Sequence, residues 1–402
     1  MKSPELLAPA GSLEKLKTAL HYGADAVYLG LSGFSLRAKT SNFDPEQLKS
    51  AVEFVHNQGK NAYVTINVFP HNRDLHALKD HVSYLKEIKP DGVIVSDLGV
   101  FDCLLETAPE LPVHISTQAN ITNSRAAMFY ERLGAKRLVL ARELSVDEIR
   151  EIRDHVSIEL ECFVHGAICI SYSGRCYISS FLANRSANSG LCTNSCRWNY
   201  TLMEEKRPGE HFPVYEDDRG TYVMSSRDLC MIQYLGKLYD AEVDSFKIEG
   251  RMKGVNYLAS VVKTYREAID SLGGGLQPYE PKQRWLTELS SVSNRGFTTG
   301  MYLGKQPDSD YNHDEQDMYK GSHNILGTVK SIKDGWGEVA LKTKLTLGES
   351  IEFLSPGLEN AVFSLREMKD AFGNHITSAR NEDTVVIPIT EGVRQNDLVK
   401  KG

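Results

Sequence analysis

The chain lacks any hydrophobic run close to the ~18 consecutive apolar residues that a membrane-spanning helix requires. Its first residues, MKSPELLAPAGS, also lack the apolar stretch of a secretory signal. No repeat of solenoid type occurs along the 402 residues. We therefore expect a cytoplasmic protein with no membrane partner.

Several catalytic signatures are also absent. The chain has no H-E-x-x-H motif, no G-x-S-x-G elbow and no identifiable nucleophile beside a base. These absences argue against a peptidase, although a catalytic triad is defined by geometry and could be assembled from distant residues. No G-x-G-x-x-G follows the first predicted strand, which argues against a dinucleotide-binding sheet.

Basic residues are fewer than acidic residues. The chain has 46 Lys and Arg against 53 Asp and Glu, a formal net charge of -7. This balance argues against a protein that coats nucleic acid by bulk electrostatics. Any contact with RNA must therefore use a local basic patch.

Short apolar runs alternate with amphipathic helical stretches from residue 5 onward, which is typical of repeated βα units around a parallel sheet. The predicted strands span residues 5–8, 26–29, 62–68, 92–96, 113–117, 137–141, 158–164 and 245–248. A predicted helix near 255–271 completes the last unit. Eight such units favour the α/β class and a closed (β/α)8 TIM-like barrel over an open doubly wound sheet.

The unit that follows the seventh strand is unusually long. Residues 166–227 separate His165 from a helix that we expect to begin at Asp228, whereas ordinary βα loops have ~2–6 residues. We predict a barrel over 1–275 that includes this Cys-rich insertion, 166–227. A connecting segment over 276–322 and a small antiparallel β-barrel domain over 323–402 would follow.

Polar residues stand where the predicted strands end, and in this fold those ends form the active-site face. They are Asn67, Ser96, Asp97, Gln118, Arg142, Glu143, His165, Glu249 and Arg251. We take Asn67, Gln118 and Arg142 as substrate-binding candidates. Each of these residues is equally compatible with a polar side chain that simply emerges into solvent at a strand end.

Cysteine is concentrated in one part of the chain: of seven residues, six fall between Cys162 and Cys230. In a reducing compartment such thiols serve as metal ligands, catalysts or packing residues more often than as disulfides. Only Cys192 and Cys196 resemble a zinc knuckle, so zinc is an imperfect alternative to an iron-sulfur cluster, which tolerates irregular spacing. Cys103, in a predicted helix, and Cys162, in the seventh strand, are expected to be packing residues.

The charge pattern of the insertion supports a bound anionic group. Residues 165–200 contain no Asp or Glu but three arginines, Arg175, Arg185 and Arg197. Guanidinium groups would offset the net negative charge of iron held by four thiolates. Arg175 and Arg197 could instead bind RNA phosphates while neighbouring aromatic side chains stack on unpaired bases, so both are substrate-binding candidates.

Several segments resemble one known family. ELLAPAGS, HGAICISYSGRC (165–176), GLCTNSCRW (190–198) and FKIEGRMK (246–253) are similar to segments of the collagenase-like peptidases, family number thirty-two of unknown catalytic type. RGFTTGMYLG (295–304) and the predicted C-terminal β-domain extend the resemblance over essentially the whole chain. Within the family, the chain is most similar to the branch of tRNA 5-hydroxyuridine modification proteins.

The resemblance implies an iron-sulfur protein of [4Fe-4S] type that hydroxylates the wobble uridine of tRNA, with prephenate as the small-molecule hydroxyl donor. The implied iron ligands are Cys169, Cys176, Cys192 and Cys230, with Cys196 as the alternate. His165, Glu249 and Arg251 match family segments and are the catalytic candidates.

Three kinds of function stay open at this point. The first is a tRNA hydroxylase, and the second is a peptidase, as the family name suggests. The third is an iron-sulfur scaffold that binds RNA, or a hydroxylase of another substrate, as in sister branches. The sequence also leaves open a homo-oligomer or a paralogous partner subunit.

Overall fold

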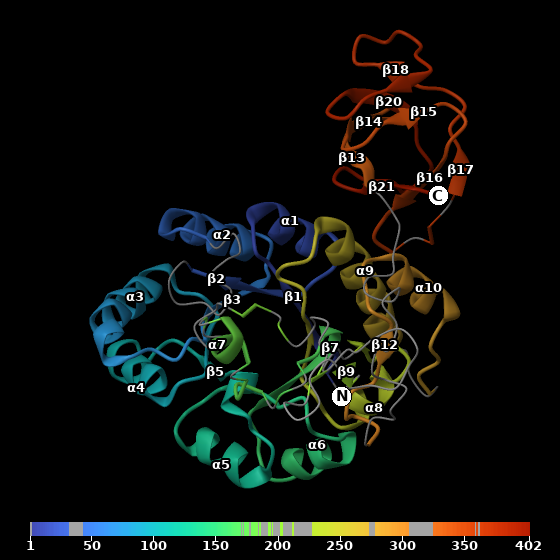
Figure 1. The fold of residues 1–402 in the computed structure, drawn as a ribbon. Coiled ribbons are helices and arrows are strands. Elements are labelled where there is room, and N and C mark those ends of the chain that lie inside the picture. Colours follow the sequence, from blue (N-terminus) through green and yellow to red (C-terminus); the bar gives the residue numbers. More distant parts are fainter. Residues whose placement is uncertain are drawn as a thin grey trace.

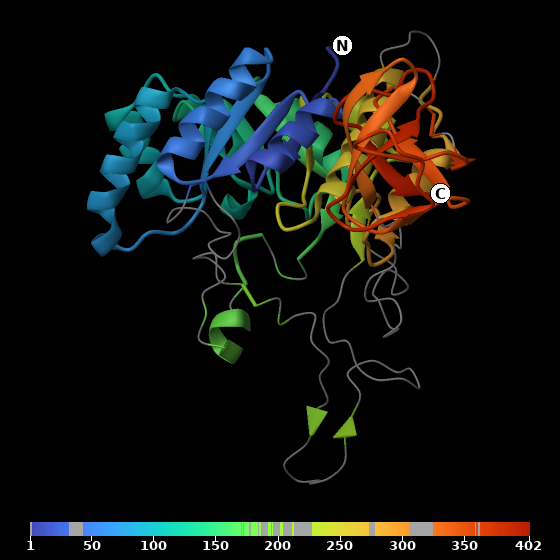
Figure 2. The same ribbon diagram turned by 90° about the horizontal axis from the view of Figure 1, so that it is seen from above.

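The computed structural model describes the barrel, parts of the insertion and the C-terminal domain (Figures 1 and 2). The described residues are 2–31, 43–169, 171, 173–176, 178–183, 185, 192, 193, 195, 202, 203, 211, 212, 227–272, 278–304, 325–357, 359, 360 and 362–402. None of the described helices is both long and apolar enough to cross a membrane.

Eight parallel strands close into a barrel (Figure 1). They are β1 (Glu5–Pro9), β2 (Ala26–Gly30), β3 (Asn61–Ile66), β4 (Gly92–Val95), β5 (Val113–Ile115), β6 (Arg137–Val139), β7 (Glu159–Ala167) and β11 (Ser245–Ile248). The order is β11-β1-β2-β3-β4-β5-β6-β7, and β11 also pairs with β7. The predicted (β/α)8 barrel is confirmed, and the strand ends differ from the predicted ones by at most three residues.

Helices form a ring around these strands (Figure 1). They are α1 (Leu13–His21), α2 (Pro45–Asn57), α3 (Leu75–Ile88), α4 (Leu98–Thr107), α5 (Ser124–Arg132), α6 (Val146–Arg153), α8 (Leu235–Asp240) and α9 (Val255–Leu272). Local chemistry sets their starts: Asp44 caps α2 and Ser145 caps α6, each in a reciprocal capping box. The buried faces of the helices and strands form one continuous hydrophobic core.

The two ends of the insertion are held together by a strand pair that the sequence did not predict. Asp228, the expected start of a helix, instead begins β10 (Asp228–Cys230), and the next helix, α8, begins at Leu235. The prediction was wrong because β7 continues to Ala167 and offers β10 an antiparallel partner, with Cys230 opposite His165. The short β12 (Phe297–Thr298) extends this pairing on the other side of β10.

Within the insertion the structure describes α7 (Ile178–Ala183) and the paired β8 (Leu202–Met203) and β9 (His211–Phe212). In Figure 2 these elements lie beyond the barrel on the side away from the amino terminus. That is the side of the carboxyl ends of the parallel strands. We call this face the mouth.

The C-terminal domain is an antiparallel half-barrel. Its strands are β13 (Ile325–Lys333), β14 (Trp336–Leu341), β15 (Leu345–Thr346), β16 (Ser350–Leu354), β17 (Val362–Ser364), β18 (Lys369–Asp370), β19 (Ser378–Ala379), β20 (Thr384–Pro388) and β21 (Leu398–Lys401). The main sheet has the order β17-β16-β21-β13-β14-β20-β18 around a core of its own. Helix α10 (Gln283–Ser291) lies between the domains and packs on α9, where Trp285 Nε1 donates to Glu267.

Candidate functional site

At the mouth, a small hydroxyl network fixes Gln118. Ser96 Oγ lies 3.3 Å from both the Asn67 carbonyl oxygen and Gln118 Oε1, and the Ser116 hydroxyl also donates to Gln118 Oε1. With its oxygen engaged by hydroxyl donors, the half-buried Gln118 amide presents its NH₂ group as the donor for a ligand. Asn67 contributes its backbone carbonyl to this network.

Arg142 is held at the end of β6 by β7. Its Nη1 donates to the Ala167 carbonyl at 2.8 Å, and its guanidinium carbon lies 4.0 Å from the ring centroid of Phe163. Its Nε is buried, and none of the described residues accepts a hydrogen bond from it. The side chain as a whole is half-buried at the mouth. A planar cation held in this way is suited to a carboxylate.

The insertion is attached to the mouth by a turn just before Cys176. Glu143 Oε1 accepts from the Ser173 backbone N at 2.8 Å, and the Ser173 hydroxyl lies 3.3 Å from both carboxylate oxygens. Gly174 has φ +75°, and a Cβ there would lie 2.3 Å from the Gln118 carbonyl oxygen. Only glycine fits this approach, so the turn places exposed Arg175 and half-buried Cys176 next to the mouth.

His165 is not an open catalytic side chain. Its ring is 1% exposed and packs among Tyr257 and Tyr265 of α9 and Phe297 of β12. Burial lowers its pKa to about 3; the charge of Asp228 opposes that shift only in part. The imidazole is therefore neutral at physiological pH and has the surroundings of a structural group.

Glu249 and Arg251 follow β11 on a tightly packed turn. Glu249 Oε2 lies 3.3 Å from the Tyr28 hydroxyl, and its carbonyl accepts from Tyr257 at 2.8 Å. Gly166 has φ +105°, and a Cβ there would lie 2.4 Å from the same carbonyl. Arg251 is 3% exposed. Of the catalytic candidates, Glu249 alone is partly exposed at the mouth.

The candidate thiols differ in exposure along the insertion. Cys169 is exposed, Cys176 and Cys192 are half-buried, and Cys230 is buried. Burial raises the pKa of Cys230 to about 11. Cys196 and Arg197 lie outside the described residues. Among the residues that the structure does describe, no three His, Cys, Asp or Glu side chains converge on a metal-sized point.

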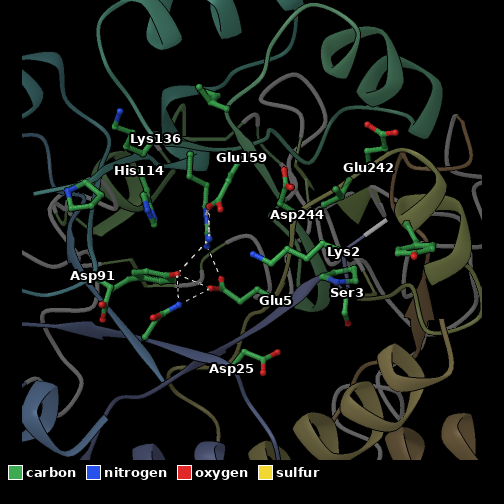
Figure 3. Close-up of a pocket in the computed structure, with 18 of the residues that line it drawn as sticks. Lys2, Ser3, Glu5, Asp25, Asp91, His114, Lys136, Glu159, Glu242 and Asp244 are labelled. Carbon is green, nitrogen blue, oxygen red and sulfur yellow. Dashed lines mark hydrogen bonds and ion pairs between the residues drawn. The ribbon is translucent and has the colours of Figure 1, made fainter. Parts of the chain in front are cut away.

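The opposite face of the barrel holds a cavity of about 1350 Å³ that sequence reasoning missed. Figure 3 shows Glu5 and Glu159 directed toward the same point of this cavity. Arg137 Nη1 lies 2.6 Å from Glu5 and 3.1 Å from Glu161, and Nη2 lies 2.6 Å from Glu159. Lys247 also pairs with Glu161, at 2.6 Å. The sequence feature that could have revealed this cluster is the presence of charged residues within predicted barrel strands, because the interior of such a barrel is usually filled by layers of aliphatic side chains.

Family models and curated relatives match nearly the whole length of this chain. Peptidase family U32 matches residues 11–312, and the Peptidase family U32 C-terminal domain matches residues 321–400. "tRNA hydroxylation protein P1" of Bacillus subtilis is 36% identical over 100% of this chain and 95% of its own. "tRNA hydroxylation protein P" of Escherichia coli is 35% identical over 98% and 96%.

Two further comparisons carry the peptidase label. A protein named "Collagenase" from Porphyromonas gingivalis is 33% identical over 98% of this chain and 96% of its own. A solved U32 peptidase is 18% identical, with a TM-score of 0.41 over 62% of this chain and 95% of that chain. The family matches and the full-length relatives establish that this chain belongs to peptidase family U32.

Proposed function

We propose that this protein is an iron-sulfur-dependent tRNA hydroxylase that forms 5-hydroxyuridine at the wobble position, with prephenate as the hydroxyl donor. The observation that carries the proposal is the docking of a Cys- and Arg-bearing turn onto a polar barrel mouth through Glu143 and Gly174. The full-length similarity to relatives named as tRNA hydroxylation proteins supplies the reaction class.

The donor set suits an iron-sulfur cluster. Four cysteines, Cys169, Cys176, Cys192 and Cys230, belong to the insertion or to its returning strand, and no Asp or Glu lies among residues 165–200. Soft thiolates select iron-sulfur or zinc centres, and the irregular spacing of these cysteines favours the cluster. The arginines would offset the negative charge that four thiolates leave on the centre. Bound iron would draw the thiols together and keep them deprotonated, and it would supply one-electron chemistry.

The mouth offers matched groups for the two substrates. The Gln118 NH₂ is a donor for a carbonyl oxygen of a uracil ring turned out of its stack. The half-buried Arg142 guanidinium is a donor for a carboxylate of prephenate, which carries two. Arg175, exposed beside Cys176, is available to an RNA phosphate.

Nucleoside analysis tests the proposal. Deletion of the gene in a strain without a paralogue is expected to remove 5-hydroxyuridine-derived nucleosides from digested tRNA, as measured by mass spectrometry. The wild-type gene should restore them, and Cys176→Ala should not. An unchanged nucleoside profile after deletion would contradict the proposal.

A peptidase is the second candidate because of the relative named "Collagenase". Cys230 is unsuited to act as the nucleophile of a thiol protease, because burial raises its pKa, which is the reverse of activation. Peptide hydrolysis that co-purifies with the protein and is absent from the Glu249→Gln variant would support the peptidase instead. RNA binding without turnover in a complete assay would support a scaffold.

A further inference from the structure

The carbonyls of two adjacent residues in β7 each accept a hydrogen bond from a buried tyrosine. Tyr265 Oη, from α9, lies 2.8 Å from the Val164 carbonyl oxygen and 3.8 Å from Cys230 Sγ. It also lies 3.3 Å from His165 Nδ1. The Tyr265 side chain is 0% exposed, so protein groups alone surround its hydroxyl.

Tyr302 forms the matching arrangement on the neighbouring residue. Its hydroxyl lies 2.8 Å from the Phe163 carbonyl oxygen, and Cys162 directly precedes Phe163 in β7. Cys162 is 1% exposed within a barrel strand and is not among the candidate ligands. The two tyrosines thus make the same backbone contact, but the contact to a candidate iron ligand is that of Tyr265, so Tyr302 serves as its control.

A phenol has a single proton to donate, and its orientation depends on the acceptors around it. Beside a neutral thiol, the stronger acceptor is the Val164 carbonyl, only 2.8 Å away. A thiolate that ligates iron carries negative charge and offers lone pairs, so a hydrogen bond from Tyr265 to Cys230 Sγ becomes charge-assisted. The hydroxyl needs only to rotate about its C–O bond to make this change.

We propose that Tyr265 is a positioning residue that donates a hydrogen bond to Cys230 Sγ and thereby tunes the iron-sulfur cluster. The inference rests on the proposed function, because it requires Cys230 to ligate iron. Hydrogen bonds to cluster sulfurs stabilise the more negative, reduced state and raise the reduction potential. Tyr265 would therefore favour reduction of the cluster.

The test compares wild type, Tyr265→Phe and Tyr302→Phe as full-length proteins purified without oxygen. Iron and sulfide analysis and the visible absorption spectrum report the cluster, and a potentiometric titration followed by electron paramagnetic resonance gives the midpoint potential. We expect a lower potential in Tyr265→Phe and a wild-type potential in Tyr302→Phe.

Each outcome bears on a different claim. Equal potentials in all three proteins would overturn the role of Tyr265. A wild-type protein without iron would overturn the proposed cofactor instead. If Tyr265→Phe does not fold, 3-fluorotyrosine introduced at position 265 keeps the hydroxyl and makes it a stronger donor. The potential should then rise, and an unchanged value would again contradict the role of Tyr265.

Discussion

Glycine 174 is a single residue on which the attachment of the insertion depends. In Gly174→Ala the new methyl group meets the Gln118 carbonyl, and the positive φ adds backbone strain of roughly 1–2 kcal/mol. We expect the turn to leave the mouth and iron retention to fall. Gly134→Ala is the matched control, since Gly134 also has positive φ (+96°) but no atom within 4 Å of the added carbon.

The measurement for this pair is iron content per chain together with the midpoint of thermal unfolding. The same backbone strain should lower both midpoints, whereas loss of iron should be confined to Gly174→Ala. Equal iron content in the two variants would show that the Gly174 contact does not position Cys176.

Glu5 gives a pH-dependent test of the charge network opposite the mouth. Burial alone would raise the pKa of Glu5, but the charge of Arg137 and hydrogen bonds from Arg137, Tyr63 and Ser245 lower it below 4.5. Because the pKa of Glu5 is lower in the folded protein than in the unfolded chain, its ionised form stabilises the fold. This stabilisation is fully present above the unfolded-state pKa and is lost as the pH falls through the folded-state pKa.

We therefore expect wild type to lose more free energy of unfolding than Glu5→Gln as the pH is lowered from about 5 to about 3. Urea unfolding at closely spaced pH values measures this difference. The exposed Glu46→Gln serves as the control and should follow wild type. If the free energy of unfolding depends on pH in the same way for wild type and Glu5→Gln, the lowered pKa of Glu5 is refuted.

At the scale of elements, the β7–β10 pair closes the insertion, and an ion pair supports it. Arg295 Nη2 lies 2.5 Å from Asp228 Oδ1, with side chains 4% and 2% exposed. Asp228 Oδ2 is buried and has no hydrogen-bond partner among the described residues. Arg295→Met would leave the whole carboxylate buried and unpaired, at a cost of roughly 3–5 kcal/mol.

Chemical unfolding measures the stability lost in Arg295→Met, with Arg150→Met as the control. Arg150 pairs with Asp147 at 2.8 Å, but the side chains are 44% and 89% exposed, so its loss should cost less than about 1 kcal/mol. Similar losses of stability in the two variants would mean that the buried Arg295–Asp228 pair stabilises the protein no more than an exposed ion pair.

This scale also shows what the sequence could predict. The barrel strands were found because each is an apolar run, and all but the seventh are followed by an amphipathic helix. Strand β10 was missed because three residues, Asp-Leu-Cys, carry no periodicity, and its pairing depends on the unforeseen extension of β7 to Ala167. His165, which local sequence had placed at an open strand end, is buried by Tyr257, Tyr265 and Phe297, which are distant in sequence.

At the scale of the molecule, the barrel and the C-terminal domain share a boundary of buried contacts. Leu354 and Leu398 belong to the hydrophobic core of the barrel, although they lie in the C-terminal domain. The Tyr22 hydroxyl donates to the Leu354 carbonyl at 2.8 Å and accepts from the Leu398 backbone N at 2.9 Å. Lys400, 0% exposed, pairs with Glu288 of α10 at 2.9 Å.

Because the two domains share these contacts, we expect them to unfold together. Scanning calorimetry of wild type should show one transition whose calorimetric and van't Hoff enthalpies agree. Tyr22→Phe removes both hydrogen bonds of the hydroxyl and leaves the Leu354 carbonyl and the Leu398 N–H buried without this partner. Each lost hydrogen bond should lower the free energy of unfolding by roughly 1–3 kcal/mol. Tyr84→Phe, whose hydroxyl makes an exposed contact to Pro45, is the control and should change stability little. Two separate transitions in wild type would show that the domains fold independently, and the shared core would then be a surface contact rather than a common folding unit.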